Sequence, residues 1–547
     1  MGGSDMPELA AGAPRAGLAR WAANPVGRAA LLGLTGAMWL IAQFAFFPGH
    51  TLNATRFIYY DQGSFLYVID CLERGEVLYR DVAWQYGPLA IAWFAAFAKV
   101  LGNSPVTLVL ALGVAVIFAW AVIVELASRV IGFGRAWLGG VCVLLPVMTH
   151  LLLRGFNNGP HSAVEAVMLA TVALLLARPA RDGRGALGLG LLLGLLQLVR
   201  FGPHLVAGLV AGVLWVASMP GRSWRERTMQ LALIGGAYAI VLASYAGWLA
   251  PRLPGAAWMD QLWPSFMTEH YRQTFASRRP DIDGVSDALV RWLPMVVASG
   301  VAVAFFSRLV GRGVKDESNA APVALLVFPL YFLVAWAVLF RSGYHVAGHL
   351  WLIGAALPLA WSGLSRRWRV LAGAAALAMA VGNASAWMGY LRNELSSDGA
   401  LGVMPNGQRL WLVGPEQRMF GALEQTLAEL PRPRHEHRRP RAAVMVAGGG
   451  VYYFFALQRP EGRHWWFLPA FVRPWEEART AESLRRCDVF LPMWSGNSGI
   501  FRAAPPAEGV ALWFPVSSEQ VGDLPDRLHF ERWILGVGAV FSVQERP

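Results

Sequence analysis

The chain has 547 residues, of which 55% are hydrophobic and only 15% are charged, whereas a soluble globular protein carries roughly 25% charged residues. Together with a mean hydropathy of +0.41, this composition excludes a soluble cytosolic enzyme, a disordered chain and a fibrous protein, and it predicts a polytopic membrane protein. The net charge of +12 indicates orientation in a membrane rather than nucleic-acid binding, because the basic residues stand mostly in short loops between apolar runs.

The predicted membrane part begins after a polar, basic segment, residues 1–26. The next run, 27–48, is long enough to cross a bilayer and too long for the core of a signal peptide. Ten further apolar runs bring the number of predicted transmembrane helices to about eleven. These runs are 105–128, 136–153, 161–177, 185–199, 203–219, 228–250, 292–309, 321–340, 350–365 and 370–388.

Arginine clusters in alternate loops predict the orientation. Five basic loops fall on the same side as the N-terminus when eleven helices are counted, and the positive-inside rule makes this side cytoplasmic. The abundant Arg, Ala and Gly are typical of a GC-rich bacterial genome, so we expect a multi-pass protein of the cytoplasmic (inner) membrane. The five loops are centred on residues 129–135, 178–184, 222–227, 308–315 and 366–369.

Two segments outside the membrane have structure of their own. The first outer loop, 49–104, contains an apolar but short run, Pro88–Leu101, which favours a helix lying in the membrane interface. The chain after about residue 390 carries charge, prolines and short runs typical of strands near 442–447 and 487–493, with helical periodicity at 417–430. We therefore predict a transmembrane domain over 27–390 and a small extracytoplasmic α/β domain over 391–547.

The first outer loop holds the most informative motifs. It places Asp61 soon after the first transmembrane helix, and continues through Tyr79-Arg80-Asp81 to Tyr86-Gly87-Pro88-Leu89. A carboxylate at the membrane edge can take a proton from an attacking hydroxyl. Taken alone, the position of Asp61 is better explained by a solvated loop residue or by the N-cap of the next helix, and only the pattern of the whole loop favours the catalytic role.

This loop resembles the first extracytoplasmic loop of the GT-C glycosyltransferases, which include protein O-mannosyltransferases and lipid A aminoarabinose transferases. In that superfamily an acidic residue after the first helix is the catalytic base, and Asp61 matches its position, although Asp-Gln stands where the family often has Asp-Glu. The resemblance implies a GT-C fold and an inverting glycosyltransferase that uses a polyprenyl-phosphate-linked monosaccharide. Asp81, Tyr79 and Tyr86 would then help to place the acceptor, while Asp70 is a rival that we expect to face water.

A second motif, Arg200-Phe-Gly-Pro203, joins two apolar runs on the outer side. It breaks the positive-inside trend, and it resembles a GT-C hairpin that contains Lys or Arg. A guanidinium there could hold a lipid phosphate through two hydrogen bonds. The alternative is that Arg200 reaches up to lipid head groups without a catalytic role.

A third polar turn contains Arg341, Tyr344, His345 and His349 between two apolar runs. We predict that Arg341, His345 and His349 contribute to the donor phosphate site. The spacing of the two histidines also fits a metal clamp, but no carboxylate nearby in sequence completes it. We therefore predict no cofactor and no metal site, and leave open whether a divalent ion takes part.

Other polar segments favour less specific interpretations. The aromatic and basic residues of the loop 251–291 suit carbohydrate binding, and suit an interfacial belt better. Residues Arg154, Asn157, Asn158 and His161 form a smaller outer turn that could line the same cavity. The run Ala447-Gly-Gly-Gly450 follows a predicted strand but lacks the Lys and Ser/Thr of a P-loop, so nucleotide binding is disfavoured.

The predicted function is transfer of a monosaccharide from a polyprenyl-phosphate carrier to an envelope glycan, lipid or protein, outside the cytoplasmic membrane. Its partners would be that donor, the acceptor and membrane lipids, with no nucleic acid. The alternative from a different class is a lipid or solute transporter, or a non-catalytic scaffold of an envelope complex. A transporter would bind near mid-membrane and often shows inverted repeats, whereas these polar clusters gather at the outer edge.

Overall fold

The computed structural model describes sixteen segments of the chain. These are residues 24–59, 61–148, 160–178, 181–219, 221–255, 257–263, 292–312, 320–338, 351–362, 364–430, 440–444, 448–464, 472, 476–491, 522–534 and 538–544.

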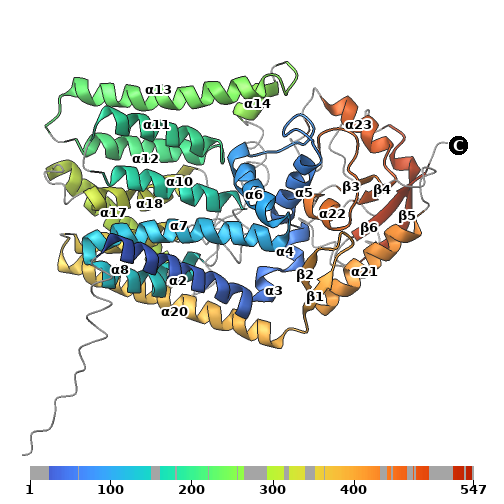
Figure 1. Ribbon diagram of the computed structural model, residues 1–547, viewed down its shortest axis with the longest axis horizontal. Helices are drawn as coiled ribbons and strands as arrows, with labels where there is room; N and C mark the ends of the chain where they lie inside the picture. The colour runs from blue at the N-terminus through green and yellow to red at the C-terminus, as the bar shows by residue number, and fades with distance from the viewer. Residues whose placement is uncertain are drawn as a thin grey trace, which may run out of the picture.

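The larger part of the molecule is a bundle of helices that run side by side (Figure 1). Among the residues that the structure describes, six helices are long and apolar enough to cross a membrane: α2 (Pro25–Phe46), α7 (Pro105–Ile131), α13 (Trp224–Leu249), α17 (Leu293–Arg312), α18 (Ala320–Val338) and α20 (Arg366–Ser396). Shorter apolar helices complete the bundle: α8 (Phe133–Gly139) with the π-helix η1 (Gly140–Leu144), α10 (His161–Leu176), α11 (Gly183–Gln197), α12 (Pro203–Ala217) and Trp351–Trp361, which ends in the 3-10 helix η5 (Leu357–Trp361). Each of the eleven predicted runs therefore contains an apolar helix.

The helices begin where the sequence offers caps. The side chains of Asn24, Ser104, Asp182 and Ser223 each accept a hydrogen bond from a backbone N–H in the first turn of the following helix. Proline stands in the first turn of α2, α7 and α12, where its missing N–H leaves no helical hydrogen bond unmade. Local chemistry thus fixes where these helices start, and burial in the bundle or in lipid stabilises the rest.

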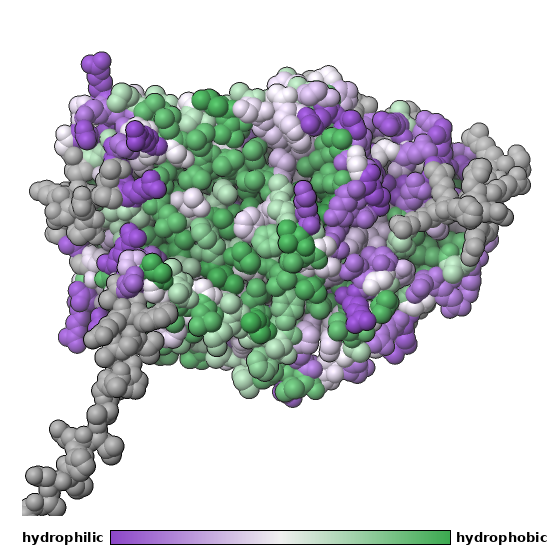
Figure 2. Space-filling model, viewed as in Figure 1, coloured by the Kyte–Doolittle hydropathy of each residue, from purple (hydrophilic) through white to green (hydrophobic). Residues whose placement is uncertain are grey.

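The surface has the polarity of a membrane protein. Figure 2 shows hydrophobic residues over the bundle, with hydrophilic residues at its far end and over the C-terminal region. We call the end that meets the C-terminal region the capped end, where α2 and α13 finish, and the opposite end the open end. The predicted arginine clusters that are described lie at helix termini of the open end, for example Arg129 in the last turn of α7 and Arg366 at the start of α20.

The last helix of the bundle runs further than predicted. We expected it to end near residue 388, but α20 continues to Ser396. Its final turns are held by the segment after α2: Glu394 accepts a hydrogen bond from the Gly49 N–H and pairs with His50 at 2.9 Å, while the Tyr390 ring lies 4.8 Å from the His50 ring. The predicted domain boundary near residue 390 therefore falls within a helix.

The C-terminal region, residues 397–547, contains a small sheet with helices, as predicted. Strands β1 (Ala400–Val403) and β2 (Arg409–Leu412) form an antiparallel pair. A four-stranded sheet has the order β3-β4-β6-β5, in which only β3 and β4 are parallel. Its members are β3 (Ala442–Val444), β4 (Val489–Leu491), β5 (Leu528–Ile534) and β6 (Gly538–Val543), accompanied by α21 (Gly414–Glu429), α22 (Gly448–Phe454), α23 (Glu477–Arg485) and the 3-10 helix η8 (Pro525–Arg527).

The first predicted outer loop lies between the bundle and the C-terminal region (Figure 1). It forms α3 (Pro48–Thr51), α4 (Ala54–Tyr59), α5 (Asp61–Glu73) and α6 (Pro88–Leu101), the last with the predicted bounds. The C-terminal region holds it at both ends, because the Trp411 N–H donates to the Leu52 carbonyl at 2.8 Å and the Tyr453 hydroxyl to the Asn103 carbonyl at 2.6 Å. The loop is therefore a fixed layer of the fold, and one continuous apolar core connects it to both neighbours.

The glycine run at 448–450 makes the closest of these contacts. It opens α22, which packs directly on α4 and α5. A Cβ atom on Gly63 of α5 would lie 2.5 Å from the Cα of Gly450, and one on Gly449 would meet the backbone of Ser64. The glycines therefore allow the backbones of α5 and α22 to touch immediately after Asp61. This packing role explains the glycine run, for which the sequence had suggested only a disfavoured phosphate-binding role.

We expect Gly450→Ala to lower the melting temperature of the detergent-solubilised protein. The added Cβ would lie 2.6 Å from the Cα of Ile58 and would also meet the Phe57 carbonyl, and backbone atoms cannot give way as a side chain can. Overpacking of this kind costs about 1–3 kcal/mol. The matched control is Gly421→Ala in α21, where a Cβ meets nothing within 4 Å and alanine favours the helix. Equal melting of wild type and Gly450→Ala would contradict the contact.

Candidate active site at the capped end of the bundle

Asp61 is the first residue of α5, immediately after the short helix α4. Its carboxylate stands at a helix N-terminus, where the helix dipole favours negative charge. The side chain is half-buried, so it is neither fully solvated nor sealed within the core. The next residue, Gln62, is buried, and its side-chain oxygen has no hydrogen-bond partner among the described residues. Asp61 is thus the acidic group that α5 leaves accessible at its start.

The surroundings of Asp61 make its carboxyl a weaker acid than the carboxyl of an ordinary, solvated aspartate. Burial raises the pKa of the Asp61 carboxyl from its ordinary value of 3.8 to about 6, while the positive guanidinium of Arg200 partly opposes this rise. A carboxyl with a pKa near 6 is ionised at neutral pH and retains more affinity for a proton than a solvated aspartate. Both properties suit a general base.

The Arg200 turn and the Tyr86-Gly87-Pro88-Leu89 motif, which the sequence gives as separate signals, pack against each other. The N–H of Gly87 donates to the Val199 carbonyl at 3.3 Å, and the N–H of Leu89 donates to the Leu198 carbonyl at 2.8 Å. A Cβ atom on Gly87 would collide with the backbone of Leu198, so glycine is needed for this approach. These contacts fix the backbone from which Arg200 extends, and Arg200 itself is buried.

A second carboxylate, Glu165, lies within electrostatic range of Arg200. It is buried on α10, and the Tyr331 hydroxyl of α18 donates a hydrogen bond to it. Arg200 therefore acts electrostatically on two carboxylates, Asp61 and Glu165. Glu165 was not predicted as a site residue. The sequence did contain a signal for it, because an acidic residue inside the predicted transmembrane run 161–177 is costly in a membrane and needs a partner.

Tyr86 and Tyr79 are parts of the wall that supports this site. The ring of Tyr86 lies 4.2 Å from the ring of His161, at the start of α10. Tyr79 is fully buried with a backbone φ of 67°, and its hydroxyl donates to the Tyr86 carbonyl at 2.6 Å while accepting from Tyr245 at 3.2 Å. The hydroxyl of Tyr79 therefore holds the loop in place, and a role for either tyrosine towards an acceptor stays a prediction.

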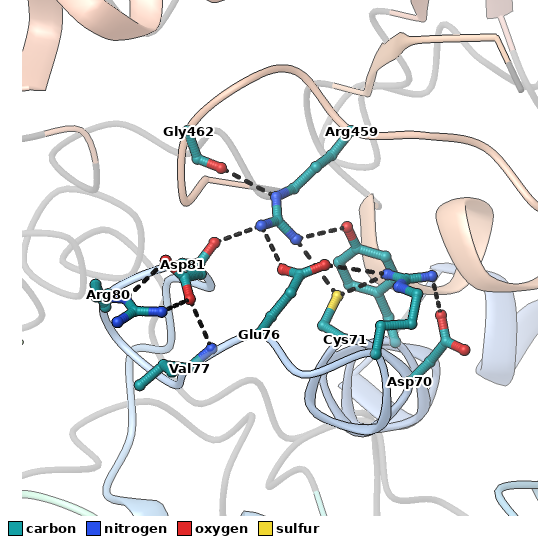
Figure 3. A network of polar contacts seen from close by, with 10 residues as sticks. Asp70, Cys71, Glu76, Val77, Arg80, Asp81, Arg459 and Gly462 are labelled. Atoms are coloured by element: carbon teal, nitrogen blue, oxygen red, sulfur yellow. Dashed lines mark hydrogen bonds and ion pairs between the residues drawn. The ribbon is translucent and has the colours of Figure 1, made fainter. Parts of the chain in front are cut away.

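Asp81 lies near the opposite end of α5 from Asp61, in a polar network (Figure 3). Its carboxylate accepts hydrogen bonds from Arg80, at 2.7 and 2.9 Å, and from the Val77 N–H at 2.8 Å. The hydrogen bond from Arg80 is the main reason that the pKa of Asp81 lies below its ordinary value. A 13-residue helix is about 20 Å long, so Asp81 lies away from Asp61, and its predicted role in placing the acceptor stays a prediction.

Arg459 of the C-terminal region is the centre of that network, as Figure 3 shows. Its guanidinium pairs with Glu76 at 2.6 Å, donates to the Tyr67 hydroxyl at 3.2 Å and bonds the Asp81 carbonyl. These anionic and polar partners keep the pKa of Arg459 above its ordinary value although burial opposes its charge. No local sequence pattern could have predicted this role, because its partners come from a loop almost 400 residues earlier.

Three predicted donor-site residues, Arg341, His345 and His349, lie outside the described residues, as do Arg154, Asn157, Asn158 and most of the loop 251–291. Their roles stay predictions. Within the described segments, no three His, Cys, Asp or Glu side chains are grouped so that they could hold a metal ion.

Comparison with known proteins bears on the fold. No protein-family model matches the sequence, and no curated protein matches it. Among solved structures, the chain is similar to ArnT from Cupriavidus metallidurans bound to undecaprenyl phosphate, with a TM-score of 0.50 and 12% identity over 94% of this chain and 98% of that chain. The same ArnT in the apo state gives a TM-score of 0.49 at 12% identity, and an Archaeoglobus fulgidus oligosaccharyltransferase with Zn and sulfate gives 0.41 at 14% identity, over 78% of this chain and 62% of that one. The first of these similarities confirms the predicted GT-C fold of a polytopic membrane protein.

Proposed function

We propose that the protein is an inverting glycosyltransferase that moves a monosaccharide from a polyprenyl-phosphate carrier to an envelope glycan, lipid or protein. The observation that carries this proposal is the arrangement of Asp61 and Arg200 on a GT-C fold. A carboxylate with a raised pKa and a buried guanidinium lie within electrostatic range of each other at the capped end of a membrane bundle. The ArnT structure of similar fold is bound to undecaprenyl phosphate, which supports a polyprenyl phosphate as the carrier.

In the proposed reaction the acceptor hydroxyl attacks the anomeric carbon C1 of the sugar. Asp61 accepts the hydroxyl proton as the new C1–O bond forms, and the bond between C1 and the phosphate oxygen breaks on the opposite face. The leaving group is the polyprenyl phosphate, whose added negative charge Arg200 stabilises through its guanidinium. Attack and departure on opposite faces of C1 invert the anomeric configuration. Arg341, His345 and His349 remain proposed as further groups at the phosphate.

We further propose that the capped end faces outward from the cytoplasmic membrane and that the N-terminus is cytoplasmic. The arginine-rich helix termini at the open end support this orientation through the positive-inside rule. The donor would then present its head group at the outer surface, where Asp61 lies beneath the C-terminal region. No soluble nucleotide sugar is needed on that side, since the lipid carrier brings the activated sugar.

The test is glycosyl transfer by the purified full-length protein in lipid nanodiscs, with radiolabelled polyprenyl-phosphate sugars and a cell-envelope extract as acceptor. We expect label to move into the envelope fraction with wild type and not with Asp61→Asn. A protein that carries the labelled lipid or a labelled sugar across a sealed vesicle, but forms no new glycosidic bond, would instead be a transporter. Absence of both activities with every donor tried would favour the scaffold.

A further inference from the structure

A cavity of about 560 Å³ lies beside the Arg459 network, at the far end of α5 from Asp61. Three segments distant in sequence form its walls. They are the loop after α5 with Glu76 and Asp81, the turn after α13 with Arg252, and the C-terminal region with Arg459 and Arg479. Neither Asp61 nor Arg200 lines this cavity, and the transfer reaction proposed above does not use it.

The acidic residues of the cavity wall already have cationic partners. Each of the four carboxylates is within ion-pair distance of an arginine, so that none contributes an uncompensated negative charge. The pairs are Glu76 with Arg459 at 2.6 Å, Asp81 with Arg80 at 2.7 Å, Glu461 with Arg441 at 3.0 Å and Arg486 at 3.1 Å, and Glu476 with Arg463 at 2.8 Å. Although burial opposes it, hydrogen bonds from His464 and Arg463 hold the pKa of Glu476 at about 2, so it stays ionised in its pair.

Two arginines of the wall are not compensated in this way. Arg252 lies over the ring of Trp248, 4.1 Å from its centroid, and donates to the Trp248 carbonyl at 2.5 Å. Arg479 is exposed on α23, in the part of the wall that the C-terminal region forms. None of the ion pairs between described residues involves either arginine, and the Nε of Arg252 is buried without a hydrogen-bond partner among the described residues. The cavity therefore offers two guanidinium groups to an anion.

Phosphate is the anion that this arrangement fits. Two planar guanidiniums from different segments of the wall can each give paired hydrogen bonds to phosphate oxygens, and the hydroxyl-bearing Thr480 lines the same cavity. Arg252 follows α13, which is long and apolar enough to cross a membrane, so the cavity opens at the level where lipid head groups lie. We propose that this cavity binds a phosphate group carried by a lipid head group or by a soluble phosphorylated sugar or polyol.

The test compares ligands that differ only in phosphate, using the full-length protein in detergent. Phosphatidic acid and diacylglycerol are the lipid pair, measured by native mass spectrometry. Glycerol 3-phosphate and glycerol are the soluble pair, measured by titration calorimetry. We expect at least one phosphate-bearing probe to bind at least about tenfold more tightly than its phosphate-free partner. Binding of phosphatidic acid alone would identify a lipid site, and binding of glycerol 3-phosphate a site for soluble phosphate.

Two variants locate that binding in this cavity. Arg479→Glu reverses the charge of an exposed residue and should leave the fold intact, while Arg252→Gln removes the second guanidinium. Each should weaken phosphate binding by about tenfold or more, whereas Arg409→Gln, on the exposed strand β2 outside the cavity wall, should not. Unchanged affinity in Arg479→Glu, or equal binding of the phosphate-free partners, would overturn the proposal. The Asp61→Asn transfer assay is independent, so either proposal can fail alone.

Discussion

Asp61→Asn should lower the rate of glycosyl transfer by about 10²–10⁴-fold, the usual contribution of a general base. Asparagine keeps the size and the hydrogen-bonding capacity of the side chain but cannot accept the hydroxyl proton. The loss should appear in kcat, because the acceptor proton is transferred in the chemical step. Affinity for a labelled polyprenyl-phosphate sugar should stay within about threefold of wild type, since removing a negative charge near the donor phosphate does not weaken its binding.

The matched control is Asp70→Asn on the same helix. Asp70 pairs with Arg74 at 2.5 Å near the other end of α5, and both side chains are partly exposed, so the pair contributes little to stability. This variant should transfer sugar at a rate within about twofold of wild type. Equal rates for Asp61→Asn and Asp70→Asn would remove Asp61 as the base.

The pH dependence of transfer should report the ionisation of Asp61. Its folded pKa of about 6 lies above the ordinary 3.8, mainly because of burial. The base form is the ionised form, so kcat/KM should be constant above about pH 7 and should fall roughly tenfold per pH unit below about pH 6. Initial rates between about pH 4.5 and pH 8 measure this directly. A flat profile over that range would contradict Asp61 as a titrating base.

The membrane part of the fold could be predicted from the sequence because it depends mainly on local composition. Runs of apolar residues identify helices wherever a bilayer covers them, and α6 was predicted to its terminal residues because Pro88 begins it and Gly102 follows it. The extension of α20 from about residue 388 to Ser396 was not predicted, because local composition does not favour a helix there. Its last turns are polar in sequence, and they are helical because Tyr390 and Glu394 bind the segment after α2.

The candidate site could be predicted only in part. Asp61 and Arg200 were found as separate motifs, but their proximity depends on the backbone contact of Gly87 with the turn at Leu198 and Val199, which no spacing reveals. The roles of Gly450 and Arg459 were beyond the sequence for the same reason, because each acts on a loop almost 400 residues away. Strands β5 and β6 were not predicted, although they have seven and six residues and β3 and β4 have only three each.

Arg200→Gln should lower transfer by about 10²–10³-fold, in line with the loss of one preorganised group that stabilises developing charge. In the proposed reaction the phosphate gains negative charge as its bond to C1 breaks, and the buried guanidinium is already in place to meet it. Glu165, which accepts a hydrogen bond from Tyr331, lies within electrostatic range of Arg200. Because Arg200 is buried and its turn is packed against Gly87 and Leu89, we expect its guanidinium to need little reorganisation during the reaction.

Two measurements separate this role from an arginine that only reaches lipid head groups. Lysine can reach head groups as well as arginine can, but it cannot give paired hydrogen bonds to a phosphate. Arg200→Lys should therefore transfer sugar clearly more slowly than wild type and faster than Arg200→Gln. In Arg200→Gln the acidic limb of the pH profile should also move to higher pH, because the positive charge that opposes the rise in the pKa of Asp61 is gone. Full activity of Arg200→Lys, together with an unchanged acidic limb in the pH profile of Arg200→Gln, would mean that Arg200 only contacts lipid head groups.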